Sequence, residues 1–220
     1  MIKISKRLQK IGDLALSRSS LNIMDVACDH ALLSIYLYEK NNNLNIIASD
    51  INTEPLKKAK ENIEKYDLQD KIELKQSDGI KLLNKNSTVV IAGVGKDTII
   101  DILENDKDKI GYIDNLIISS HSKIDEVRKD IVKLGFKITK EEIVYDDNKY
   151  YIIILFTKGK ETYNQKEYLM GPYLLTHKDE MFYEYYNYLI KKYTAILDKM
   201  PNNTNKEELL NIINIIKEEL

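Results

Sequence analysis

The sequence has no tryptophan, one cysteine and three histidines among its 220 residues. A single cysteine, Cys28, excludes a disulfide within one chain and is compatible with a reducing compartment. The cysteine and the histidines are scattered, so their spacing matches no zinc site and we expect no metal. No apolar run approaches the roughly 20 residues that a membrane helix needs. The basic start of the chain also lacks the apolar core of a secretory signal. We therefore expect a cytoplasmic protein without a membrane partner.

Charge of one sign is not in excess either, since the formal net charge is −2. A hydrophobic content of 43% and a charged content of 31% are typical of a globular protein. The first 18 residues nevertheless contain a single acid, Asp13, and five basic residues: Lys3, Lys6, Arg7, Lys10 and Arg18. This local basic patch can meet phosphates, or it can be an ordinary solvated helix face.

Glycine is missing from the turn in which a dinucleotide-binding fold needs it. Residues 22–26 read as a short buried strand, A-C-D-H follows, and a helical apolar pattern starts near Leu32. This strand, turn and helix are the first unit of a nucleotide-binding α/β sheet, but none of the three fingerprint glycines is present. Asp25 and Asp29 would repel a pyrophosphate and attract a cationic cofactor such as S-adenosylmethionine. Alternatively, the two aspartates cap the following helix.

Two more acids follow the next predicted strands. Asp50 comes after the strand 45–49, 21 positions beyond Asp29, where ribose-binding carboxylates occur in such folds. Asp78 and Gly79 follow the strand 71–76, and this carboxylate can accept a hydrogen bond from an adenine amino group. A helix cap at Asp50 and a simple Asp-Gly turn are the alternatives. All these acids are predicted to face one crevice at the carboxyl edge of the sheet.

The apolar run 87–92 predicts a central strand, and Gly93-Val94-Gly95-Lys96 follows it. Two glycines at this point let a ligand approach the backbone closely. The segment lacks the earlier glycine and the Ser/Thr after lysine that a phosphate-binding loop requires, so we reject that interpretation.

The pattern of the first 160 residues predicts a Rossmann-like α/β fold, the seven-stranded sheet of class I methyltransferases. The other expected elements are helices at 3–18, 31–41, 54–66, 97–106 and 124–134, a strand at 114–119, and a hairpin of 136–145 and 149–157 joined by Asp146-Asp147-Asn148.

Residues 161–220 are predicted to form a second domain, an antiparallel, coiled-coil-like helical hairpin. Its first helix has a heptad seam made of Phe182, Tyr186, Leu189, Tyr193, Ile196 and Met200. Pro201-Asn202-Asn203 interrupts the pattern, and a second apolar stripe contains Leu209, Ile212, Ile213 and Ile216.

Several motifs, read together, resemble the bacterial tRNA (adenine(22)-N1)-methyltransferase family over essentially the whole chain. They are I-S-K-R-L, D-V-A-C-D-H-A, A-S-D-I-N, S-D-G-I, V-I-A-G-V-G and E-Y-L-M-G-P-Y-L-L, in this order. The resemblance implies a class I enzyme that uses S-adenosylmethionine to methylate N1 of an adenine in the D-stem of tRNA. We expect a monomer, although the sequence does not decide the oligomeric state.

The resemblance also assigns roles to residues. The expected cofactor contacts are Arg7, Asp25, Ala27, Cys28, Asp29, His30, Asp50, Ile51, Asp78, Gly79, Ala92 and Gly93. Asp29 and His30 are the candidate catalytic residues, because a group beside the target base can stabilise the charge that develops on it. The expected phosphate contacts are Lys3, Lys6, Arg7, Lys10 and Lys96.

The chain departs from the family pattern at three places. Ala27 and Lys96 stand where glycine is usual, and Ser119-Ser120-His121 replaces a Gln-Pro-Asn-like stretch. Alanine is tolerable at position 27 if its φ is negative. The alternatives are a methyltransferase of another RNA or a small molecule, a non-catalytic tRNA-binding relative, and a nicotinamide oxidoreductase, which the missing glycines disfavour.

Overall fold

The computed structural model describes residues 2–201 and 206–220. The chain divides into two compact units, Met1–Thr162 and Tyr163–Leu220. Two residues of the predicted break after the first tail helix, Asn202 and Asn203, lie outside the described residues.

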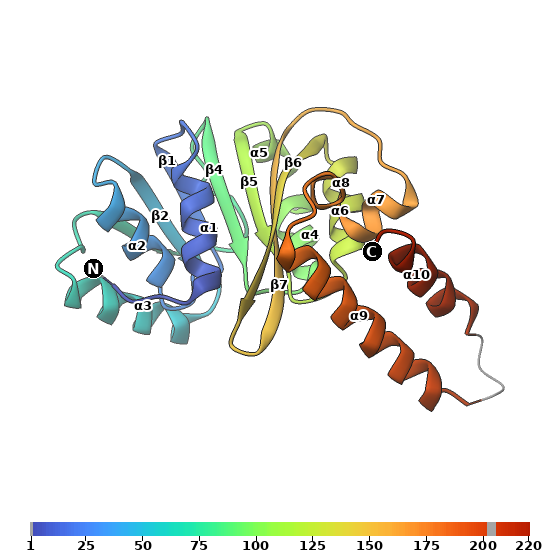
Figure 1. The fold of residues 1–220 in the computed structure, drawn as a ribbon. Helices are drawn as coiled ribbons and strands as arrows, with labels where there is room; N and C mark the ends of the chain where they lie inside the picture. The colour runs from blue at the N-terminus through green and yellow to red at the C-terminus, as the bar shows by residue number, and fades with distance from the viewer. Residues whose placement is uncertain (1, 202–205) are drawn as a thin grey trace. The chain divides into compact units, whose positions relative to one another are not determined.

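A seven-stranded sheet forms the centre of the first unit, in the described part of the chain (Figure 1). The strands are β1 Asn22–Val26, β2 Asn45–Asp50, β3 Ile72–Gln76, β4 Ser87–Ala92, β5 Ile113–Ser119, β6 Phe136–Asp146 and β7 Lys149–Lys158. Their order is β3-β2-β1-β4-β5-β7-β6, with β1 to β5 parallel and β7 antiparallel to both neighbours. The predicted fold class is confirmed.

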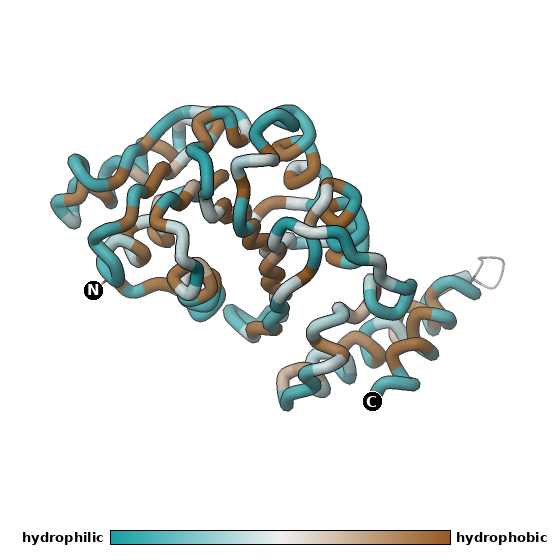
Figure 2. The backbone as a smooth tube through the Cα atoms, turned by 90° about the horizontal axis from the view of Figure 1, so that it is seen from above, coloured by the Kyte–Doolittle hydropathy of each residue, from teal (hydrophilic) through white to brown (hydrophobic). Residues whose placement is uncertain are grey.

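Burial explains why the central strands read as apolar runs. Val89, Val90 and Ile91 in β4 are fully buried, because helices cover both faces of a parallel sheet. Figure 2 shows the contrast, with brown stretches inside the first unit and teal at its outer turns and loops. The antiparallel pair β6–β7 closes the sheet through Asp147 and Asn148, whose φ values of 47° and 58° suit a two-residue turn. Asp146 still pairs with Lys149 between β6 and β7, so the turn that connects the two strands is one residue shorter than predicted.

The helices lie in two layers (Figure 1). One layer contains α1 Lys6–Leu16, α2 Leu32–Lys40 and α3 Thr53–Lys65. The other contains α4 Lys96–Glu104, the short α5 Lys107–Ile110, and α6 Ile124–Lys133. The predicted helix at 97–106 therefore ends early, and a separate turn of helix follows. The reason is Asp106, which is buried and accepts a hydrogen bond from the Ile80 backbone N–H at 2.9 Å instead of continuing α4.

Ser5 sets the start of the first helix. Its hydroxyl accepts a hydrogen bond from the Leu8 N–H and caps α1, while Ile11, Leu14 and Ala15 are buried. The cap leaves Lys6 and Arg7 in the first turn, next to the sheet edge where the strands β1 to β5 end.

The second unit contains helices in its described part: α7 Gln165–Met170, α8 Pro172–Thr176, α9 Glu180–Lys199 and α10 Glu207–Lys217. Asn164 and Glu167 form a capping box at the start of α7. None of the helices in the described ranges combines the length and apolar character that crossing a bilayer requires.

The seam of α9 differs from the heptad prediction at one position. Phe182 and Tyr186 are buried as expected, and the Tyr186 hydroxyl donates to the Met170 carbonyl at 2.6 Å. Ile196 is 42% exposed, however, and Leu197 is buried in its place. A straight helix turns once in 3.6 residues and drifts away from a strict heptad stripe, which explains the shift.

Candidate functional site

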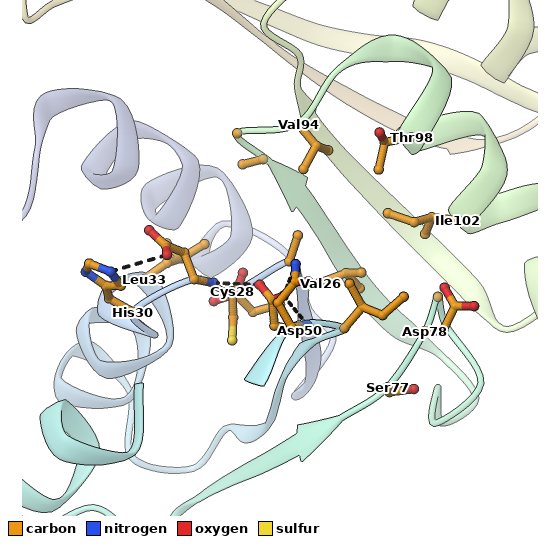
Figure 3. A pocket seen from close by; sticks show the side chains of 18 of the residues that line it. Val26, Cys28, His30, Leu33, Asp50, Ser77, Asp78, Val94, Thr98 and Ile102 are labelled. Atoms are coloured by element: carbon orange, nitrogen blue, oxygen red, sulfur yellow. Dashed lines mark hydrogen bonds and ion pairs between the residues drawn. The ribbon is translucent and has the colours of Figure 1, made fainter. Parts of the chain in front are cut away.

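A cavity of about 660 Å³ opens at the carboxyl ends of β1 to β4 (Figure 3). Every residue that the sequence predicted as a cofactor contact lines it: Arg7, Asp25, Ala27, Cys28, Asp29, His30, Asp50, Ile51, Asp78, Gly79, Ala92 and Gly93. Parallel strands bring their carboxyl ends to one sheet edge, which is why residues far apart in the sequence meet here.

The turn after β1 is left-handed at three residues that are not glycine. The φ values of Ala27, Asp29 and Ala31 are 55°, 49° and 55°. The condition of a negative φ at Ala27 is therefore not met. A β-carbon in this region costs roughly 1 kcal/mol or more, so the turn is strained. Hydrogen bonds from the Cys28 N–H to the Ser49 carbonyl (2.9 Å) and from the Ala31 N–H to the Cys28 carbonyl (2.8 Å) hold it.

Asp25 is 3% exposed and points at the first turn of α2. Its Oδ2 accepts a hydrogen bond from the Ser34 hydroxyl at 2.7 Å, which ties it to the first turn of α2. The residue at the start of α2 is Ala31, so Asp25 is not the N-cap of this helix. Burial raises the pKa of Asp25 to about 7, although the Ser34 hydrogen bond opposes the change. Near neutral pH its carboxyl group is thus divided between the neutral and charged forms.

Asp29 and His30 lie at the rim of the cavity. His30 Nε2 is 3.3 Å from Asp29 Oδ1, and the Asp29 side chain is 71% exposed. The residue before α2 is Ala31, so Asp29 does not cap this helix. A carboxylate on an open rim can meet a base that enters from solvent.

Asp50 ends β2 with both carboxylate oxygens oriented by the backbone. Oδ1 accepts from the Asn52 N–H at 2.9 Å, and Oδ2 accepts from the Asp29 N–H at 3.3 Å (Figure 3). The residue at the start of α3 is Asn52, so Asp50 is not its cap. The Asn52 side-chain amide also donates to Oδ1, at 3.4 Å. A carboxylate has about four acceptor positions, so about one is left for a ligand. Ile51 beside it is 56% exposed and offers an apolar surface.

Gly79 has a steric reason to be glycine. Its φ is 76°, and a β-carbon there would collide with the carboxylate of Asp106. The Ser77 N–H donates to the Asp50 carbonyl at 3.0 Å, which ties the turn after β3 to the end of β2. This turn presents Asp78 to the cavity (Figure 3).

Arg7 approaches the cavity from α1, close to Gly93. Its Nη1 is buried and has no hydrogen-bond partner in the described part of the chain. Its guanidinium carbon lies 4.8 Å from the centre of the Tyr151 ring, and its backbone N–H donates to Asp146 Oδ2 at 3.0 Å. A buried guanidinium nitrogen without an acceptor indicates a place for an anionic group of a ligand.

The predicted phosphate contacts do not gather in one place. Lys3 and Lys6 are exposed. Lys10 forms an ion pair with Glu142 at 2.7 Å. Lys96 does not line the cavity.

Carboxylates surround the Lys96 ammonium: Asp130 at 3.1 Å, Asp97 at 3.4 Å and Glu126 at 3.7 Å. Its side chain is only 17% exposed. The geometry thus favours a role for Lys96 in joining α4 to α6.

The lone thiol does not suit nucleophilic catalysis. Burial, and then the charges of Asp25 and Asp50, raise the pKa of Cys28 above its usual range. Cys28 therefore serves as a small turn residue. Within residues 2–201 and 206–220, no group of three His, Cys, Asp or Glu side chains could hold a metal ion.

One wall of the cavity was not predicted. It comes from α4 and the residue that caps its C-terminus, and it contains Thr98, Asp101, Ile102 and Asn105. Figure 3 shows Thr98 and Ile102 across the cavity from His30 and Cys28. Their spacing of three, one and three residues puts them on one helix face, a signal that the sequence contains. His121, Asn52 and Ser77 also line the cavity without having been assigned to the cofactor.

Comparison with known proteins agrees with the motifs. A sequence model described as "TrmK: tRNA (adenine(22)-N(1))-methyltransferase" matches residues 23–219. The chain is 26% identical to the tRNA (adenine(22)-N(1))-methyltransferase of Bacillus subtilis over 94% of this chain and 90% of that protein.

Two solved structures are similar over nearly the whole chain. One is a putative tRNA (m1A22) methyltransferase of Streptococcus pneumoniae in complex with S-adenosyl-L-methionine. It is 27% identical to this chain, with a TM-score of 0.88, and the match covers 99% of this chain and 100% of that chain. The other is M. capricolum TrmK in complex with S-adenosyl-homocysteine. It is 33% identical to this chain, with a TM-score of 0.83, and the match covers 98% of this chain and 96% of that chain. The chain therefore belongs to the tRNA (adenine(22)-N(1))-methyltransferase family.

Proposed function

We propose that this protein transfers a methyl group from S-adenosylmethionine to N1 of an adenine in tRNA, at position 22 as the family description states. The observation that carries the proposal is the family match over residues 23–219, joined to one cavity at the carboxyl edge of the sheet. A tRNA substrate implies a cytoplasmic protein.

The lining of the cavity fits this cofactor. Five aspartates, at positions 25, 29, 50, 78 and 101, give it an acidic character that suits a cation and not a pyrophosphate. The single arginine of the lining, Arg7, has a buried Nη1 without a partner in the described chain, which suits a carboxylate. The cofactor has both kinds of group, an ammonium and a carboxylate, on its methionine part.

Each part of the lining can be given a task. Asp50 would accept a hydrogen bond from the cofactor ribose, and Ile51 would cover the cofactor adenine. Asp78 would accept from the amino group of that adenine. Arg7 would hold the carboxylate, while Ala27 and Gly93 let the backbone come close. When bound, the cofactor supplies a methyl group on a positively charged sulfur.

The chemistry at the target base needs positioning more than proton transfer. Adenine N1 has an in-plane lone pair, so no base has to remove a proton before attack, and alignment supplies much of the rate. Positive charge develops on the adenine as N1 becomes methylated. Asp29, with its exposed carboxylate at the rim, would stabilise that charge, and His30 at 3.3 Å would orient Asp29.

A base in a tRNA stem must leave its helix to reach a cavity of this kind. Phosphates on either side of the extruded base then need positive charge near the rim. Lys3 and Lys6 are the candidates that the geometry favours, because Lys10 and Lys96 already face carboxylates and Arg7 is assigned to the cofactor. Whether the protein acts as a monomer stays a prediction.

The test is incubation of the purified protein with labelled S-adenosylmethionine and unmodified bulk tRNA, followed by nucleoside analysis. We expect 1-methyladenosine, mapped to position 22. Label in another nucleoside would contradict the assigned base. Thermal stabilisation by S-adenosylhomocysteine without label in tRNA would indicate a binding protein or a different substrate.

Matched variants separate cofactor binding from folding. Asp50→Ala should abolish stabilisation by S-adenosylhomocysteine, whereas Asp70→Ala, at an exposed aspartate outside the cavity, should retain it. Stabilisation by NADH instead of S-adenosylhomocysteine would support the oxidoreductase alternative.

A further inference from the structure

His121 lines the cavity beside Gly93 and Arg7, and it has no part in the cofactor assignments. It lies in the loop after β5. Three hydrogen bonds join this loop to the loop after β4: His121 N–H to the Val94 carbonyl at 3.2 Å, the Ser120 hydroxyl to the same carbonyl at 3.4 Å, and Gly93 N–H to the Ser119 carbonyl at 3.1 Å. The backbone of His121 is thus fixed beside Gly93.

The His121 imidazole and the Arg7 guanidinium flank one point. A β-carbon placed on Gly93 would lie 3.8 Å from His121 Nε2 and 3.9 Å from Arg7 Nη1. Gly93 has no such carbon, so the space between the two side chains stays open. The ring of Tyr151 lies behind both, 6.3 Å from the His121 ring centre.

The His121 side chain is accessible and has no hydrogen bond to another side chain in the described ranges, which separates it from His30, the partner of Asp29. A neutral imidazole can accept a hydrogen bond at one ring nitrogen, and its ring can stack on a purine. His121 can therefore contact a base in two ways without giving up a contact within the protein.

The order of the strands indicates which ligand His121 meets. Asp78 and Asp50, assigned to the cofactor adenosine, follow β3 and β2 at one side of the sheet. Gly93 and His121 follow β4 and β5, on the other side of β1. A cofactor that extends from β3 towards β4 presents its reacting end to the β4–β5 side. A substrate must approach from there.

We propose that His121 contacts the target adenine, with Nε2 accepting a hydrogen bond from the 6-amino group. The proposal rests on the proposed function, because it assigns a residue to the substrate of that same site. As N1 gains the methyl group, positive charge spreads to the amino group and makes it a better donor. The hydrogen bond therefore strengthens in the transition state and should affect the chemical step more than tRNA binding.

The experiment pairs a change in the protein with a change in the substrate. Two tRNAs are prepared that differ only at position 22, one with adenosine and one with purine riboside, which keeps N1 and lacks the amino group. Single-turnover rates are measured with excess enzyme for the wild type and for His121→Phe, which retains a stacking ring and loses the acceptor. We expect the preference for adenosine over purine to fall about tenfold in His121→Phe.

Two features of the design isolate the contact. The weaker base pairing and lower intrinsic reactivity of purine are the same for both enzymes, so they cancel in the comparison of preferences. His177→Phe, at a histidine in α8's C-cap that stacks on Tyr173, should show the wild-type preference. Thermal stabilisation by S-adenosylhomocysteine should be equal in all three proteins.

Equal preferences in the wild type and His121→Phe would overturn the proposal. A fall in tRNA affinity with an unchanged preference would also overturn it, because it would assign His121 to general RNA binding. Failure of the wild type to methylate the adenosine tRNA would instead refute the proposed function.

Discussion

The guanidinium of Arg7 lies over the ring of Tyr151, 4.8 Å from its centre, so the first helix and the last strand meet at one corner of the cavity. Tyr151 itself does not line the cavity. It touches two residues that do, Arg7 and His121. Tyr151 is thus a positioning residue, and its effect on a ligand must act through these neighbours.

Replacing Tyr151 with leucine should weaken cofactor binding. The lost cation–π contact is worth about 1 kcal/mol, which corresponds to roughly a fivefold increase in the Kd of S-adenosylhomocysteine. Tyr151→Phe keeps the ring and should keep the affinity. Calorimetric titration measures both. Tyr150→Leu, at a ring that packs on Tyr145 instead, is the control. If Tyr150→Leu and Tyr151→Leu lost the same affinity for S-adenosylhomocysteine, the positioning role of Tyr151 would be refuted.

Asp29→Asn should slow methyl transfer about tenfold while leaving the Kd of S-adenosylhomocysteine nearly unchanged. The substitution removes a negative charge from the rim and keeps the side-chain size, so it tests stabilisation of charge on the adenine. Single-turnover rates on tRNA give the result. Glu61→Gln, at an exposed acid of α3, should have no effect. A full rate in Asp29→Asn would rule out the electrostatic role.

Asp25 should make stability depend on pH. Its pKa is about 7 in the folded protein against 3.8 for a free side chain, so the folded state binds more protons between these values. The free energy of unfolding therefore falls as pH rises from about 4 to 7, and it is not regained above pH 7. Between pH 5 and pH 7 the loss is roughly 2 to 3 kcal/mol.

Asp25→Asn lacks this titration and can still hydrogen-bond Ser34. Denaturation by urea at pH 5 and pH 8 should show the variant gaining stability relative to the wild type at the higher pH. Parallel changes in both proteins would show that Asp25 does not titrate in this range.

Ala27→Gly should not destabilise the protein, although glycine usually does. A left-handed alanine costs roughly 1 kcal/mol, which about offsets the entropy that glycine adds to the unfolded chain. Ala59→Gly is the control, because Ala59 is buried within α3 and the change there should cost about 1 kcal/mol or more. Thermal denaturation compares them. If Ala27→Gly lost as much stability as Ala59→Gly, the result would contradict the strain at Ala27.

The exposed lysines and the paired lysine should differ in their effect on tRNA affinity. If Lys3 and Lys6 contact phosphates, changing both to glutamine should reduce the slope of log affinity against log salt by about 2. Lys96→Gln should leave the slope unchanged, because Asp130, Asp97 and Glu126 already surround this ammonium. A reduced salt slope in Lys96→Gln would contradict this expectation and would show that Lys96 contacts RNA phosphates.

The sequence was most informative where one physical cause governs a segment. Burial on both faces makes β4 a continuous apolar run, and parallel strands must end at one edge, so the meeting of Asp50 and Gly93 could be predicted. The wall from α4 was missed because Thr98 and Ile102 belong to an ordinary amphipathic helix, and only the tertiary fold decides what such a face covers.

Local conformation was harder to predict than topology. Nothing in the letters A-C-D-H-A signals that Ala27 and Ala31 adopt positive φ, because glycine is the usual marker of that conformation. The charge of Lys96 was visible, whereas two of its three partners, Glu126 and Asp130, lie on α6, 30 and 34 positions later. Ion pairs between helices depend on packing that spacing alone does not reveal.

The hydrogen bond from the Arg7 N–H to Asp146 spans 139 positions of the chain. It can therefore form only late during synthesis, after most of the first unit has been translated. Strands β1 to β5 can pair while the ribosome is still translating, and α1 can already pack on α2, where the Tyr36 hydroxyl donates to Asp13 at 2.8 Å. The first turn of α1, however, gains Asp146 only when the β6–β7 hairpin has emerged. Until then Arg7 has neither Asp146 nor Tyr151 to hold it. The nascent protein thus acquires the acidic side of its cavity first and the basic corner last.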